Sequence, residues 1–166
     1  MSDAPTEWMP REEWDALVRG DDCPLCAEVA SVEPANEYGY TVADLAISRL
    51  RLNANQSVPG YCVLICHRHA REPFELAPED RALFFEDMLH AAAVIEAVYG
   101  AIKMNYQILG NAVPHVHAHI VPRYYGDPAP SRPIDPGAAT VLLAPDEYAR
   151  QAGAIRAALG IASNGV

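Results

Sequence analysis

Three of the chain's six histidines alternate with small apolar residues in one short run, His115-Val116-His117-Ala118-His119. Side chains of a β-strand point to opposite faces in turn, so this spacing predicts a strand with three imidazoles on one face. Residues on the same face of a strand are roughly 6.5 to 7 Å apart, so one phosphate-sized group could touch two rings. The run therefore predicts a histidine-lined surface backed by an apolar core.

The run has two other interpretations. The rings could form the solvated face of an edge strand, but Pro114 and Pro122 bracket the run and the apolar residues alternate regularly with the rings. The rings could also be three ligands of a catalytic zinc, which would leave an open position for an activated water. Three rings in a straight row on one strand fit a single ion poorly.

The composition limits the classes of partner that we expect. The 166 residues are 51% hydrophobic and 20% charged, which is enough for one domain with a core, over residues 1–166. Twelve Lys and Arg against 22 Asp and Glu give a formal charge of −10, which opposes binding to nucleic acid polymers or anionic membranes. Because no run approaches about 18 apolar residues and the start lacks a signal pattern, we expect a cytoplasmic protein with no membrane partner.

Two of the four cysteines form the motif Cys23-Pro24-Leu25-Cys26. In a reducing compartment such a pair indicates half of a metal site or a redox motif. A redox motif follows a strand, whereas the loop-forming residues 20–22 precede this one, so a metal is favoured. Cys62 and Cys66 lie in an apolar run and are predicted to be small core residues of a strand.

The hydrophobic periodicity predicts about five strands with one long helix packed on them. The strands are expected over residues 38–45, 47–52, 61–66, 103–108 and the histidine run, and the helices over 14–19, from Pro78 to about Gly100, and from 145 to about 159. The core of the domain spans about residues 20–123. Four prolines predict an extended arm from residue 124 onward, before the terminal helix.

The second half of the long helix, residues 89–98, is interrupted by only two polar residues. A helix that is apolar almost all round needs cover on more than one side. One side would lie on the sheet and the other on a second copy of the chain. We therefore predict a homodimer.

The three alternating histidines, His115, His117 and His119, are here called the triad. Followed by Ile120-Val121-Pro122, the triad resembles the signature of the histidine triad (HIT) superfamily of nucleotide hydrolases and transferases. The resemblance extends over residues 59–69 and 105–114, and it covers roughly residues 23–122. It implies an α+β fold of about five antiparallel strands and a long helix, paired into a dimer whose sheets join. It also implies attack on the α-phosphorus of a nucleotide, a nucleotidyl-histidine intermediate, and transfer to water or another acceptor.

Carried over by position, the resemblance makes His117 the nucleophile and His119 a donor to the phosphate or the leaving group. A neutral imidazole is nucleophilic near pH 7 if Nδ1–H donates to a backbone carbonyl and leaves Nε2 free. Asn111 stands where many members carry a glutamine that donates to the phosphate. Ala112 and Tyr61 stand where many members carry a serine and a histidine, so phosphate recognition is expected to differ here.

The resemblance also indicates substrate-binding residues. The turn after the second long strand is expected to form the wall for base and ribose, with Leu52 in apolar contact and Asn53 near the ribose hydroxyls. Asn105 is a further expected substrate-binding residue, together with His119.

Some members of the superfamily bind zinc through a Cys-x-x-Cys motif, a histidine after the third strand and the first triad histidine. The corresponding residues are Cys23, Cys26, His69 and His115. Two cysteines and two histidines suit a closed, tetrahedral structural zinc, which would order a loop-rich N-terminal segment.

The leading hypothesis is a hydrolase that acts at the α-phosphate of a nucleoside phosphate derivative. A dinucleoside polyphosphate, a nucleoside phosphoramidate and an adenylyl sulfate all present that phosphate. The alternatives are a phosphorylase or nucleotidyltransferase of the same family, a zinc hydrolase that uses the histidine row as ligands, and a non-catalytic nucleotide-binding protein.

Overall fold

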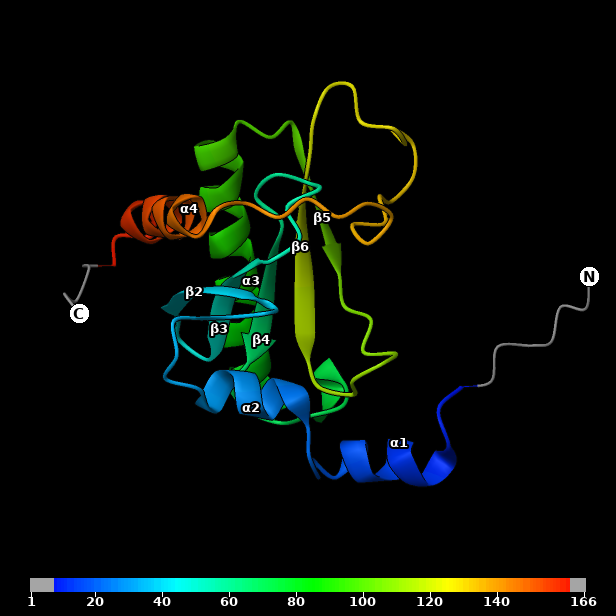
Figure 1. The fold of residues 1–166 in the computed structure, drawn as a ribbon. Coiled ribbons are helices and arrows are strands. Elements are labelled where there is room, and N and C mark those ends of the chain that lie inside the picture. Colours follow the sequence, from blue (N-terminus) through cyan, green and yellow to red (C-terminus); the bar gives the residue numbers. More distant parts are fainter. Residues whose placement is uncertain (1–7, 162–166) are drawn as a thin grey trace, which may run out of the picture.

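The computed structural model describes residues 8–161, which form a six-stranded antiparallel sheet with helices on both faces (Figure 1). The strands lie in the order β1 (Ala35–Asn36), β2 (Gly39–Asp44), β3 (Ser48–Asn53), β4 (Cys62–Cys66), β6 (His117–Arg123) and β5 (Lys103–Gln107). The predicted α+β class is confirmed. The additional strand is β1, whose two residues are too few to show a period in the sequence.

The helices are α1 (Arg11–Val18), α2 (Pro24–Ala30), α3 (Pro78–Tyr99) and α4 (Pro145–Ala158), with a short 3₁₀ turn, η1 (Pro73–Glu75). The long helix α3 has proline at its first position and two acidic residues in its first turn, and it ends at Gly100, whose φ of +66° favours glycine. The expected α3 and α4 are therefore present. Helix α2 was not predicted, because seven residues show too little periodicity.

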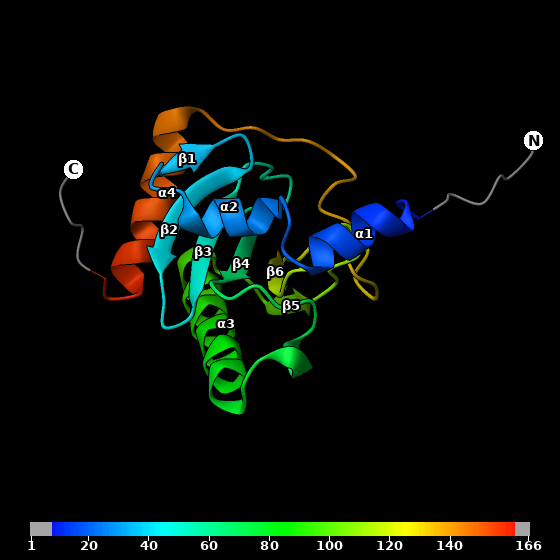
Figure 2. The ribbon, with the colours of Figure 1, turned by 90° about the horizontal axis from the view of Figure 1, so that it is seen from below.

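Helices α3 and α4 cover one face of the sheet, and α2 lies on the other face (Figure 2). Every second residue of the central strands points to the face that α3 covers. These buried residues include Leu50, Leu52, Leu64, Ala118 and Ile120. Cys62 and Cys66 are fully buried in the same core, as predicted. The residues between these core positions face α2, and the candidate site lies on that side.

The prediction that Leu52 contacts a base is wrong. Its side chain is 0% exposed and lies in the core under α3. The alternation of β3 places Arg51 and Asn53, rather than Leu52, on the face that carries the site.

Helix α3 packs against the sheet and also against α4. Helix α4 thus supplies part of the cover that the sequence analysis assigned to a second copy of the chain. Leu83, Leu89 and Val98 of α3 remain exposed in the single chain. The homodimer therefore stays a prediction.

The buried carboxylate of Asp87 on α3 fixes the turn between β2 and β3. It accepts hydrogen bonds from the Ala46 N–H (3.2 Å), the Ile47 N–H (2.9 Å) and the Ser48 hydroxyl (2.6 Å). In Asp87→Ala these donors lose their partner, so we expect the free energy of unfolding to fall by about 3 kcal/mol. Thermal denaturation should show a Tm roughly 6 to 12 °C lower. Asp87→Asn keeps one acceptor oxygen, so its free energy of unfolding should fall by less. An unchanged Tm in Asp87→Ala would contradict the role of this carboxylate.

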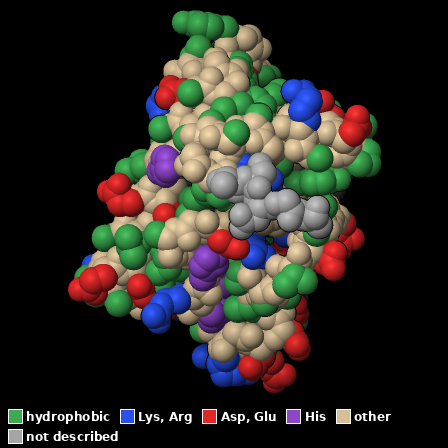
Figure 3. All heavy atoms as spheres, turned by 90° about the vertical axis from the view of Figure 1, so that its left-hand side faces the viewer, with side chains coloured by type: hydrophobic (Ala, Val, Ile, Leu, Met, Phe, Trp, Pro, Cys, Tyr) green, Lys and Arg blue, Asp and Glu red, His purple; other side chains and the backbone are tan. Residues whose placement is uncertain are grey.

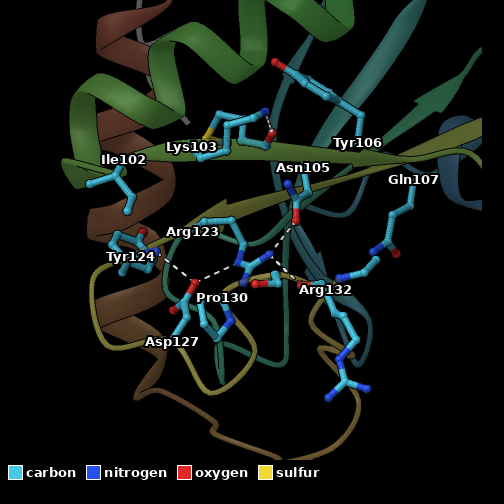
Figure 4. A pocket seen from close by; sticks show the side chains of 13 residues that line it. Ile102, Lys103, Asn105, Tyr106, Gln107, Arg123, Tyr124, Asp127, Pro130 and Arg132 are labelled. Atoms are coloured by element: carbon cyan, nitrogen blue, oxygen red, sulfur yellow. Dashed lines mark hydrogen bonds and ion pairs between the residues drawn. The ribbon is translucent and has the colours of Figure 1, made fainter.

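The proline-rich arm, residues 124–143, has no helix or strand, but it is a series of tight turns rather than the extended segment predicted. Arg123 holds its first part against the sheet (Figure 4). The partners of the Arg123 guanidinium are the Asp127 carboxylate (2.7 Å), the Asn105 side-chain oxygen (2.9 Å) and the carbonyls of Ala129 (2.6 Å) and Arg132 (2.9 Å). Each bond to a charged donor contributes more than a neutral one. The arm is thus held in place without a helix or strand of its own.

Among the described residues, no helix has both the length and the apolar composition that crossing a bilayer requires. On the face drawn in Figure 3, acidic and basic side chains are interspersed with hydrophobic ones. A basic stripe is the usual footprint of nucleic-acid binding, and the described residues on this face do not form one.

Candidate active site

The second and third triad histidines share one surface of β6. His117 pairs with Ile65 of β4 and His119 with Val63, and the two rings have centroids 5.1 Å apart. Because β6 lies between β4 and β5, both rings stand on a strand that is paired on each side. The pair is therefore held on a rigid surface.

His115 does not belong to this surface. It precedes β6, and its N–H donates to the Val113 carbonyl (2.8 Å) in a tight turn. Its ring is fully buried among Cys23, Cys26 and His69. The predicted row of three rings is thus corrected to a pair and a separate first histidine, and a solvated histidine face is excluded by the burial of His115 and His117.

The hydrogen bonding of His117 leaves one ring nitrogen free. Its Nδ1 lies 2.6 Å from the His115 carbonyl oxygen. A carbonyl only accepts, so Nδ1 carries the proton and Nε2 has an available lone pair. Burial lowers the pKa of His117, so the ring is neutral near pH 7. These are the requirements for an imidazole nucleophile.

The ring of His119 forms its hydrogen bond with Tyr61. The Tyr61 hydroxyl lies 2.6 Å from His119 Nδ1, and the two rings stack with centroids 5.9 Å apart. Burial raises the pKa of Tyr61 to about 12, so the phenol keeps its proton and can donate a hydrogen bond to Nδ1 or accept one from it. Burial and the neighbouring His117 lower the pKa of His119 to about 4, so the ring is neutral near pH 7. When Tyr61 donates to Nδ1, the proton of the neutral ring lies on Nε2, where it can donate to a bound group.

Tyr61→Phe tests this arrangement. Without the hydroxyl, His119 can rotate or exchange tautomers, so we expect kcat to fall about tenfold for a substrate of this site while KM changes less than twofold, which is about the loss of one hydrogen bond. The ¹⁵N shifts of the ring should report both tautomers of His119 in the variant and one in the parent. An Nδ1-protonated His119 in the parent protein would contradict the assignment.

Two cavities meet at His119. The first, here named the apolar cavity, has a volume of about 520 Å³ and is lined by Pro24, Leu25, Glu28, Tyr38, Arg51, Asn53, Val63, Ile65, Leu109, Gly110, Asn111, Ala112, Val113, His117 and His119. The second, the polar cavity, has a volume of about 300 Å³ and is lined by Asn53, Asn55, Tyr61, Gln107, Leu109, His119, Asp135, Pro136 and Gly137. Two of the expected contact residues, Asn53 and Asn111, are thus brought to the histidines.

Asn105 is not brought to them. Its side-chain oxygen accepts a hydrogen bond from Arg123, and it lines a separate cavity beside the arm (Figure 4). It lies opposite Val121, two positions further along the sheet than His119. The structure corrects the prediction that Asn105 binds substrate.

The apolar cavity contains a charged pair that the sequence analysis missed. Arg51 is 3% exposed and forms an ion pair with Glu28 of α2. Its guanidinium also donates to the Gly39 carbonyl (2.6 Å) and the Asn36 side-chain oxygen (2.8 Å). The alternation of β3 places Arg51 beside Asn53, but its partner lies on a helix that the sequence did not reveal.

The four predicted metal ligands come together from three distant segments. The ligand atoms of Cys23, Cys26, His69 and His115 all lie within 4.8 Å of one another. Among the described residues, 8–161, this is the only group of three or more Cys, His, Asp or Glu close enough to hold an ion. The triad histidines together therefore do not form the catalytic zinc site that the sequence left open.

The donors of this cluster fit a tetrahedral zinc. The His115 Nδ1 lies 3.3 Å from the His69 Nδ1, 3.4 Å from the Cys23 Sγ and 3.5 Å from the Cys26 Sγ. Zinc with Zn–N bonds of about 2.0 Å and Zn–S bonds of about 2.3 Å gives tetrahedral edges of about 3.3 Å between nitrogens and about 3.5 Å between nitrogen and sulfur.

The outer ring nitrogens point to the same conclusion. His115 Nε2 lies 2.8 Å from the Cys66 carbonyl oxygen, and His69 Nε2 lies 3.0 Å from that of Val18. Both carbonyls accept, so both Nδ1 atoms present lone pairs to the cluster. Two such lone pairs at this distance would suit a cation bound between them, and carbonyl partners on the outer nitrogens are usual for metal-bound histidine.

Comparison with known proteins gives a family match over residues 39–126, to the HIT domain. The bis(5'-nucleosyl)-tetraphosphatase (asymmetrical) of Schizosaccharomyces pombe is 31% identical over 86 residues, which are 49% of this chain and 47% of that protein. An uncharacterized HIT-like protein of Methanocaldococcus jannaschii is 26% identical over 80 residues, or 46% of this chain and 62% of that one. The matches thus span less than two thirds of either relative.

Solved structures show the same fold. A histidine triad protein from Sinorhizobium meliloti has a TM-score of 0.66 and 28% identity, and the match covers 71% of this chain and 87% of that one. A zinc-bound histidine triad family protein from Mycobacterium smegmatis has a TM-score of 0.60 and 22% identity, with 84% and 94% of the two chains covered.

Proposed function

Because the chain belongs to the HIT family, we propose that it cleaves the bond between the α-phosphorus of a nucleoside phosphate derivative and its leaving group, with His117 as the nucleophile. The observation that carries this proposal is the hydrogen bond from His117 Nδ1 to the His115 carbonyl oxygen, at 2.6 Å. It leaves the Nε2 lone pair free on a ring that lines the apolar cavity.

The reaction takes two steps. The Nε2 lone pair of His117 forms a bond to phosphorus while the bond from phosphorus to the leaving atom breaks, and the leaving atom takes the electron pair and a proton from solvent. A water oxygen then attacks phosphorus, the Nε2–phosphorus bond breaks, its electrons return to the ring, and the water releases a proton to solvent. The products are the nucleoside monophosphate and the leaving group, and His117 is regenerated.

The other site residues assist this chemistry. His119 donates from Nε2 to the phosphate or to the leaving atom, since Tyr61 holds the opposite nitrogen. Asn111 and Asn53 line the apolar cavity near the histidines, where an amide can donate to phosphate and to ribose hydroxyls. The remaining walls are mostly aliphatic and suit a nucleobase.

We also propose that Cys23, Cys26, His69 and His115 bind a structural zinc. The fit of the four donors to a tetrahedron supports it, and so does the zinc-bound family member. Protein side chains would fill all four coordination positions of the zinc. The ion would therefore order the segment around α2 rather than activate water. His115 would be held by the ion through its ring while its carbonyl orients His117.

The homodimer remains part of the proposal. Strand β5 is an edge of the sheet, and Ile102, Tyr106 and Leu109 in and beside it are exposed. An edge strand with exposed apolar side chains favours pairing with another strand. A single-chain mass in light scattering at micromolar concentration would contradict a dimer.

Trapping the intermediate tests the proposed reaction. The protein is mixed with diadenosine tetraphosphate or with an adenosine phosphoramidate, quenched within milliseconds and digested for mass spectrometry. We expect an adenylyl group on the peptide that contains His117. Turnover without any modified histidine, together with loss of activity on chelation, would instead favour a metal-activated water.

Product analysis distinguishes a hydrolase from a phosphorylase. The partial likeness to a tetraphosphatase favours water as the acceptor. Adding inorganic phosphate should therefore leave the product as the nucleoside monophosphate. Formation of a nucleoside diphosphate would assign the chain to the phosphorylase class.

A further inference from the structure

We propose that the polar cavity is the leaving-group site and that Asp135, on the proline-rich arm, makes it select leaving groups with a positive charge over polyphosphate chains. The ligand class is a nucleoside phosphoramidate whose amine carries a second, protonated nitrogen. This inference rests on the proposed function, because it takes His117 as the nucleophile.

The arrangement of the two histidines places the leaving group. His117 lines only the apolar cavity, whereas His119 lines both cavities. A displacement at phosphorus occurs in line, so the leaving group departs on the side away from the attacking nitrogen. With the nucleoside in the apolar cavity, the phosphate lies between the two rings and the leaving group extends past His119 into the polar cavity.

The charges around the two cavities oppose a polyphosphate. Arg51 is the only Lys or Arg among their lining residues, and its charge is neutralised by Glu28. The polar cavity has one charged lining residue that is not a histidine, and this is the Asp135 carboxylate. Each further phosphate of a substrate would add a negative charge with no cation to receive it, in a chain of net charge −10.

The arm that carries Asp135 is fixed over the cavity. The Asn55 amide donates to the carbonyls of Pro136 (2.8 Å) and Ala139 (2.7 Å), and the Ser57 hydroxyl also donates to Pro136 (2.8 Å). One Asp135 oxygen accepts from the Gly137 N–H (2.8 Å), which orients the carboxylate. The carboxylate therefore has a defined position in the wall of the cavity.

The negative charge of Asp135 acts on Tyr61 and, through Tyr61, on the environment of His119. Burial raises the pKa of Tyr61, and the charges of Cys62 and Asp135 raise it further. Tyr61 in turn contacts His119. A cationic leaving group in the polar cavity would lie between the Asp135 carboxylate and His119. The Asp135 carboxylate would be its one ion-pair partner there.

A matched pair of substrates tests the inference. Adenosine 5'-phosphoramidates of 1,4-diaminobutane and of 1-aminopentane differ only in a terminal ammonium against a methyl group. At low ionic strength we expect kcat/KM to be about fivefold higher for the diaminobutane compound, as is usual for one partly exposed ion pair, and to be lowest for diadenosine tetraphosphate. Asp135→Asn keeps the acceptor for the Gly137 N–H, and in this variant the ratio of kcat/KM for the diaminobutane compound to that for the aminopentane compound should fall close to one. In Asp135→Lys the aminopentane compound should become the better substrate.

The control is Asp146→Asn, which removes the same charge from an exposed position on α4 outside both cavities, and should leave the preference unchanged. Equal kcat/KM for the two phosphoramidates in the parent protein, or an unchanged preference in Asp135→Asn, would overturn the inference while the proposed reaction stands. If no adenylylated His117 forms with any of the three compounds, the proposed function itself fails.

Discussion

Replacing His117 with asparagine is expected to lower kcat by at least about 10⁴-fold for any substrate of this site, because the group that forms the bond to phosphorus is lost. Asparagine can keep the hydrogen bond to the His115 carbonyl, which His117 makes at 2.6 Å. The fold and the cavities should therefore persist. Steady-state kinetics measures kcat, and calorimetry with AMP should show a Kd within a few-fold of the parent.

The matched control for this variant is His90→Asn, on the exposed side of α3, which should keep full activity. Retention of turnover by His117→Asn would end the nucleophile hypothesis. Loss of both turnover and AMP binding in a folded protein would mean that the ring serves binding rather than bond formation. Binding without turnover is the outcome that the structure predicts.

Replacing Cys23 with serine is expected to remove the zinc and to lower the free energy of unfolding by roughly 3 to 5 kcal/mol, since a structural zinc contributes directly to folding. For a chain of this length the Tm should fall by about 10 °C. Burial, which the substitution leaves in place, is the main cause that raises the pKa of Cys26, so this residue should stay a thiol in the variant. Elemental analysis and thermal denaturation measure the two effects.

Cys62→Ala is the control, because Cys62 is fully buried in the core, away from the four-residue cluster. It should keep one zinc per chain although it also loses some stability. Less than about half an equivalent of zinc in parent protein prepared without chelator would contradict the site. Loss of zinc should also reduce kcat, because the His115 carbonyl that orients His117 would lose its support.

The histidine run shows how far pattern reasoning reaches. Alternation correctly placed His117 and His119 on one face, and it separated them from Ala118 in the core. It could not show that a turn at Val113 removes His115 from the row. A backbone turn of two residues leaves no periodic signal, so only the coordinates reveal that the first ring points into the cysteine cluster.

The two wrong substrate contacts have different causes. Leu52 belongs to the same alternating set as Leu50, so the strand pattern itself places it in the core. Asn105 does face the same side of the sheet as His119, but it pairs with Val121, two residues further along β6, and its side chain is hydrogen-bonded to Arg123. The error on Leu52 could be avoided from the sequence alone. The error on Asn105 could not, because the pairing register of β5 and β6 decides which residues lie beside His119.

Local periods and local motifs are enough to predict the long strands, the helix from Pro78 to Tyr99, the histidine pair of β6 and the Cys-x-x-Cys half of the proposed metal site, whereas His69 and His115 entered that site through the family resemblance. The contacts between distant segments became visible only in the folded chain, such as Tyr61 with His119, Glu28 with Arg51, and the arm around Asp135 with the Asn55 loop. Periodicity in a sequence reports which face of one element is buried. The partner of that face depends on how the whole chain packs, and a single element carries no record of it.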